Sequence, residues 1–86
     1  MPEISRFFGI IIQMYFSDHA PPHFHATYQN HKIVIKIDDG AVIKGQFPPR
    51  ILGFVQEWRA IHVEELMHNW HQGNIEGTFN KIAPLE

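Results

Sequence analysis

The amino-acid sequence predicts an α+β fold: a small, mostly antiparallel sheet of three or four strands followed by one long helix. Two observations support this prediction. Residues 4–47 are rich in β-branched and aromatic side chains and include clearly alternating segments. From residue 49 onward, apolar side chains recur at helical spacing instead. Because strands and helix are segregated along the chain, we expect the helix to pack on one face of the sheet.

The sheet region contains several strand-like segments separated by turn signals. Residues 4–16 are interpreted as one bent strand or two short ones, with Gly9 at the irregularity. Residues 23–28 and 32–37 alternate, and the second segment places Ile33, Ile35 and Ile37 on one face. Asp-Asp-Gly at 38–40 predicts a hairpin turn, and residues 41–47 supply the returning strand.

The helix is expected to start near Pro49 or Arg50, since proline is tolerated in a first helical turn, and to stop near Gly73. Its helical repeat comprises Ile51, Leu52, Val55, Trp58, Ile61, His62, Leu66, Asn69 and Trp70. Beyond it, Phe79, Ile82 and Leu85 are spaced three apart. This spacing predicts a short C-terminal segment docked on the core, with a helical turn as one option.

Length and composition limit the classes of protein to consider. With 86 residues, the chain forms a single domain, residues 1–86. It has no cysteine, which favours a reducing compartment, and neither a signal peptide nor an apolar run of membrane-spanning length is apparent. We therefore expect a cytoplasmic protein with no membrane association. The net charge of −2 predicts no general affinity for nucleic acid.

The segment Asp-His-Ala-Pro-Pro-His-Phe-His at residues 18–25 is the most informative chemical feature. On a strand, His23 and His25 would point to the same face, so both imidazoles are available to one ion. Asp18 or His19 would complete the set, and His19, His23 and His25 are the predicted metal ligands. Three protein ligands plus water form an open zinc site, and imidazole also suits copper and nickel.

Three other interpretations of the chain stay open. His23 and His25 can be ordinary strand residues beside a rigid proline corner. The two histidines, with Asp18 and an arginine such as Arg6, can instead form an acid–base site acting on RNA. Finally, the basic side chains of residues 32–50, namely Lys32, Lys36, Lys44 and Arg50, or an unpaired edge strand can bind a partner. The sequence holds no complete catalytic motif, so protein binding is the favoured function, and Asp18, His19, His23, His25 and Arg6 are the candidate binding residues.

Several stretches resemble the small bacterial family known as domain of unknown function 4160. They are residues 1–9, 14–16, 18–26, 57–58, 65–70 and 81–85, of which 18–25 is the most specific. The resemblance implies a two-gene, toxin–antitoxin-like cassette. The partner would be a small protein of the type called domain of unknown function 2442, and nucleic acid would be contacted through the complex. The family has no established catalytic residues to carry over.

Overall fold

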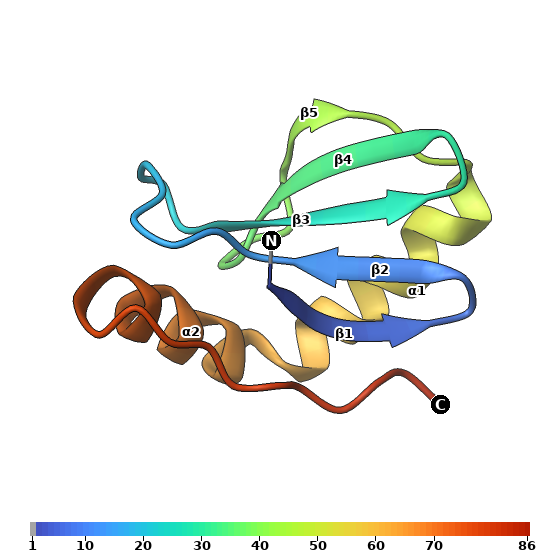
Figure 1. Cartoon of the computed structure of the whole chain (residues 1–86). Coiled ribbons are helices and arrows are strands. Elements are labelled where there is room, and N and C mark those ends of the chain that lie inside the picture. The colour runs from blue at the N-terminus through green and yellow to red at the C-terminus, as the bar shows by residue number, and fades with distance from the viewer. Residues whose placement is uncertain (1) are drawn as a thin grey trace.

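The structure, a computed structural model, describes residues 2–86 and is an α+β fold (Figure 1). Five strands form one antiparallel sheet in the order β1-β2-β3-β4-β5, so each strand pairs with its neighbours in sequence. The strands are β1 (Glu3–Phe7), β2 (Ile10–Gln13), β3 (His23–Tyr28), β4 (His31–Lys36) and β5 (Val42–Gly45). Two helices follow, α1 (Pro49–Ile61) and α2 (Val63–Ile75).

The sheet has five strands where the sequence predicted three or four. The extra strand arises because residues 4–16 form two short strands. Phe8 and Gly9 both have positive φ, 51° and 79°, which is the conformation that a two-residue hairpin turn requires. Phe7 then pairs with Ile10, and β1 and β2 run antiparallel. Of the two alternatives for this segment, the pair of short strands is therefore confirmed.

The single long helix of the prediction is divided at His62. This residue leaves helical geometry, with φ −115° and ψ 23°, and its backbone N–H is shared between the carbonyl oxygens of Trp58 and Arg59. The prediction of one helix was wrong because no proline or glycine marks the break, and the helical repeat continues through it. The break turns α2 away from α1, so that α2 extends toward the β2–β3 connection (Figure 1).

The core lies between α1 and one face of the sheet. Trp58 of α1 is fully buried and packs against the rings of Phe7 and Phe24, at centroid distances of 5.5 and 5.8 Å. The alternation predicted for β4 is confirmed, since Ile33, Ile35 and Ile37 are all buried. The opposite face of the sheet is not covered by α1, because side chains alternate between the two faces of a strand.

The C-terminal segment docks on this core, as predicted, without forming a helical turn. The backbone N–H of Ile82 donates to the carbonyl oxygen of Ile4 at 3.0 Å, which covers the outer edge of β1. The indole N–H of Trp58 donates to the carbonyl oxygen of Ala83 at 2.8 Å. Ile82 and Leu85 are buried, so the tail forms part of the core.

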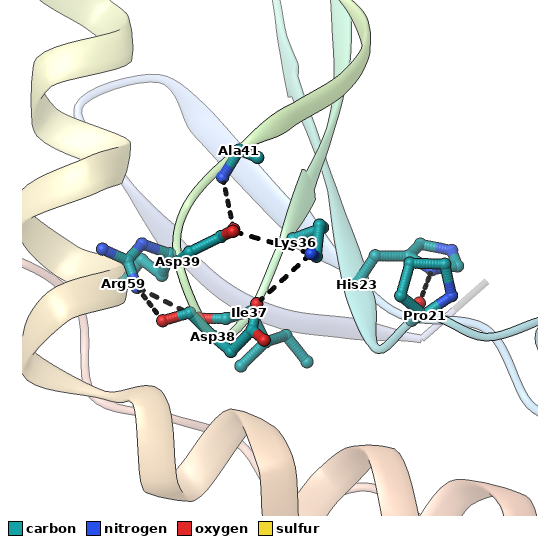
Figure 2. A network of polar contacts seen from close by, with 8 residues as sticks. All are labelled: Pro21, His23, Lys36, Ile37, Asp38, Asp39, Ala41 and Arg59. Atoms are coloured by element: carbon teal, nitrogen blue, oxygen red, sulfur yellow. Dashed lines mark hydrogen bonds and ion pairs between the residues drawn. The ribbon is translucent and has the colours of Figure 1, made fainter.

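Helix α1 also holds the turn between β4 and β5 (Figure 2). The Arg59 guanidinium donates to the carbonyl oxygen of Ile37 at 3.0 Å, and the Gln56 amide donates to that of Gly40 at 2.7 Å. Asp39 accepts the backbone N–H of Ala41 at 2.9 Å. These bonds confirm the predicted turn at residues 38–40 and fix the position of β5 relative to α1.

Among residues 2–86, no helix combines the length and apolar character that a membrane crossing needs.

Candidate functional site

The connection between β2 and β3, residues 14–22, folds back so that Asp18 reaches the first residues of β3. Ser17 has a positive φ of 54°, and the Ala20–Pro21 peptide bond is cis. The ring of Phe16 stacks on that of Phe79, in the C-terminal tail, at 4.5 Å with an interplanar angle of 7°. The loop is therefore held between β3 and the tail, and this path brings the Asp18 carboxylate to the histidines.

Asp18, His23 and His25 converge on one point. The Asp18 Oδ2 atom lies 2.8 Å from Nε2 of His23 and 3.5 Å from Nε2 of His25. One ligand atom from each of the three residues lies within 4.8 Å of those of the other two. The two imidazoles come from the same face of β3, with ring centroids 5.2 Å apart. His23 and His25 therefore point to the same face of a strand, as their spacing predicted.

The hydrogen bonds of His23 define how its ring is protonated. Nδ1 lies 2.7 Å from the carbonyl oxygen of Pro21 (Figure 2), and a carbonyl oxygen can only accept. Nδ1 therefore carries a proton, and in the neutral ring Nε2 presents a lone pair toward the Asp18 carboxylate at 2.8 Å. Two electron-rich atoms at this distance are held together by positive charge between them, either a proton or a metal ion.

His25 completes the group with an unpaired nitrogen. Its Nε2 atom is buried and has no hydrogen-bond partner among the described residues, since the approach of Asp18 at 3.5 Å is too long for a well-formed bond. Burial lowers the pKa of His25; the attraction of Asp18 opposes this shift and the charge of His23 adds to it. His25 is thus neutral at pH 7, the form in which imidazole binds metals.

Asp18 is held as a carboxylate. Burial by itself raises its pKa, but the backbone N–H of His19, which donates to Oδ1 at 2.8 Å, lowers it. The two neighbouring imidazoles act in the same direction, and the pKa of Asp18 lies below its usual value as a result. The site therefore presents one anionic oxygen and two imidazoles, all of which are largely but not fully shielded from solvent.

Aromatic side chains from two other parts of the chain surround the histidines. The Trp70 ring of α2 lies 5.1 Å from that of His23, and the Tyr15 ring lies edge-on to His25 at 4.5 Å. Trp70 was expected as part of the helical repeat and is indeed a buried core residue, whereas Tyr15 was not among the predicted site residues. Their contacts with the site depend on the bend at His62 and on the strand register, neither of which a local sequence pattern reveals.

The other predicted site residues lie apart from this group. The His19 imidazole is exposed, and its contribution is the backbone N–H that binds Asp18. Arg6 forms an ion pair with Glu3 on β1 at 2.7 Å. The spacing left either Asp18 or His19 as the third member of the set. The structure brings Asp18, rather than His19, together with His23 and His25.

Comparison with known proteins identifies a family for this chain. The family model described as Domain of unknown function (DUF4160) matches residues 9–71, which include the whole of the site. Searches of the curated proteins and of the solved structures returned no significant match.

Proposed function

The chain belongs to the family described as a domain of unknown function, DUF4160, and for this member we propose a metal-binding function in which Asp18, His23 and His25 hold one divalent transition-metal ion. The observation that carries the proposal is the convergence of an unpaired imidazole nitrogen and a second imidazole on one carboxylate oxygen. Each side chain offers a ligand atom in the form that a metal binds, because carboxylates and neutral imidazoles are ordinary ligands of zinc and its neighbours.

The second hydrogen bond of His23 supports the same proposal. Histidines that bind metals through one nitrogen usually donate the other N–H to a backbone carbonyl or a carboxylate, which orients the ring. His23 makes such a bond from Nδ1 to the Pro21 carbonyl oxygen. A histidine that served only as a surface strand residue would not need both ring nitrogens engaged.

The chemistry follows from the number of ligands. Three protein ligands leave a fourth position of a tetrahedral zinc ion open to water or substrate, the arrangement of hydrolytic rather than structural sites. A metal ion held by these residues would supply an activated water near neutral pH and would polarise a bound carbonyl or phosphoryl oxygen. Asp18 would balance the charge of that ion, and Trp70 and Tyr15 restrict the movement of the two imidazoles.

Metal titration tests this proposal. The metal-free protein is titrated with Zn²⁺ by calorimetry and with Co²⁺ by visible absorption, which reports tetrahedral coordination. We expect one ion per chain. We expect His25→Gln and Asp18→Asn each to weaken metal binding by at least roughly 10–100-fold. That is the usual cost of losing a residue that only hydrogen-bonds a metal ligand, and loss of a ligand itself should cost no less.

The matched controls are His19→Gln, beside the site, and His31→Gln, on β4. Both should bind the metal as the unchanged protein does, and thermal melting of every variant verifies that it is folded. The proposal fails if the unchanged protein binds no ion, or if His19→Gln weakens binding as much as His25→Gln does.

The second candidate function is binding of a small protein partner, within a toxin–antitoxin-like module. Strand β5 favours it, since it is an edge strand and its side chains Val42 and Ile43 are 44% and 48% exposed. An edge with exposed β-branched residues is suited to pair with a strand of another chain. Co-expression with the small protein of the domain of unknown function 2442 type from the same two-gene cassette should give a complex in gel filtration, and Ile43→Lys should abolish that complex. This second candidate is contradicted if the two unchanged proteins elute separately at micromolar concentration.

A further inference from the structure

A groove crosses the sheet on the face opposite α1 and begins at the metal-site residue His25. Its volume is about 320 Å³, and it is lined by side chains of β2, β3, β4 and β5. Strand pairing explains how these side chains meet: Gln13 and Val34 lie directly across from His25, and Lys44 lies across from Val34. The groove thus runs across four neighbouring strands. The three spacings between these strands add up to about 14 Å.

The charge of this groove differs from that of the molecule as a whole. Lys32 and Lys44 line it, and no carboxylate is among its lining residues in the described chain. The net charge of −2 comes entirely from residues 49–86, because residues 1–48 carry four acidic and four basic side chains. The sheet region is therefore neutral overall, with positive charge concentrated in the groove, and an anionic ligand is favoured there over the helical half.

The uncharged lining residues narrow the class of anion. Tyr15 is 37% exposed and stands edge-on to His25 at one end of the groove, where its ring can stack on a nucleobase. Gln13 and Thr27 supply an amide and a hydroxyl that can hydrogen-bond ribose hydroxyls and base edges. Lysines for phosphates, an aromatic ring for bases and neutral polar groups for 2′-hydroxyls together describe a surface for single-stranded RNA.

We propose that this groove binds single-stranded RNA, with Lys32 and Lys44 on the phosphates, Tyr15 on a base and one phosphodiester brought beside His25. That the bound strand is also the substrate class of the metal site rests on the proposed function. Binding itself does not, because none of the groove residues except His25 is a proposed ligand.

Fluorescence anisotropy with a labelled, unstructured RNA of about ten nucleotides tests the proposal. The protein is kept in EDTA at pH 7.5, so that the outcome is independent of the metal. We expect Lys32→Gln combined with Lys44→Gln to weaken binding at least tenfold in 50 mM salt. We also expect it to reduce the slope of log K against log salt by about 1.4, since each phosphate contact on a single strand contributes about 0.7.

Lys81→Gln is the matched control, because Lys81 is an exposed lysine that lies outside the groove. It should leave affinity and slope nearly unchanged, whereas Tyr15→Ala should weaken binding by about tenfold without changing the slope. Thermal melting confirms that each variant is folded.

Three results overturn the inference: no binding of RNA by the unchanged protein, equal losses for Lys81→Gln and the double variant, or equal affinity for DNA of the same sequence. The last result would remove the role of Gln13 and Thr27 at the ribose hydroxyls. RNA binding without metal binding would refute only the proposed function, and metal binding without RNA binding would refute only this inference.

Discussion

Asn69 joins α2 to the C-terminal tail and provides a direct test of how the tail is held. Its side chain is 1% exposed, and its amide donates to the carbonyl oxygen of Asn80 at 2.8 Å. The same side chain accepts the backbone N–H of Asn80, also at 2.8 Å. Asn69→Ala removes both hydrogen bonds at once. Because the tail also carries Phe79, which stacks on Phe16, the effect should reach the loop that presents Asp18.

The magnitude follows from the two bonds. At about 1 kcal/mol each, with an added penalty for leaving buried polar groups unpaired, their loss costs roughly 2–3 kcal/mol. Alanine is a better helix former than asparagine, which offsets about 0.5 kcal/mol. The net loss in free energy of unfolding is therefore about 2 kcal/mol, which lowers the melting temperature of a domain this small by roughly 8–16 °C.

Thermal and urea unfolding followed by circular dichroism measure this change. Asn80→Ala is the control, because both hydrogen bonds use the backbone of Asn80 and its side chain is exposed. It should change stability by less than about 0.5 kcal/mol. The reasoning is refuted if the two variants are equally destabilised, or if Asn69→Ala melts within 3 °C of the unchanged protein, at about the limit expected of a neutral surface substitution.

Three further substitutions test the β4–β5 pair, helix α1 and the turn between β4 and β5. Gly45 has φ +81°, and a Cβ there would collide with the carbonyl oxygen of Lys32, so Gly45→Ala should destabilise the β4–β5 pair by more than about 1 kcal/mol. Gly53→Ala, where a Cβ meets open space on α1, should instead stabilise the protein by up to about 1 kcal/mol; the reverse order in urea melts would contradict this account. The pKa of Asp39 is lowered, first by its hydrogen bond from Ala41, so the ionised group adds stability above pH 3.8 that is lost as pH falls through the lowered pKa. Asp39→Asn keeps the hydrogen-bond acceptor but cannot ionise, so the free energy of unfolding should fall less steeply as the pH drops below about 4. An unchanged pH dependence in this variant would show that the lowered pKa has no effect on folding.

Local sequence patterns were sufficient for most of the secondary structure. The alternation of residues 32–37 and the Asp-Asp-Gly turn predicted a strand and a hairpin that the structure contains. A helix start near Pro49 or Arg50 was predicted because a first helical turn tolerates proline, and α1 begins at Pro49. The break at His62 was missed because no proline or glycine marks it and the helical repeat continues through it. The sequence predicted at most four strands, because β1 and β2 are short and only two residues separate them.

That His23 and His25 share one face of a strand, and that prolines stiffen the chain before them, could be predicted from the sequence. Both facts follow from the period of two in a strand and from the fixed φ of proline. The sequence did not reveal that Asp18, rather than His19, meets these imidazoles, or that lysines from β4 and β5 line a groove beside them. The path of a loop and the register between strands are set by packing with distant residues, such as Phe79 against Phe16. For that reason the pair of histidines was evident from the sequence, and the site that they complete was not.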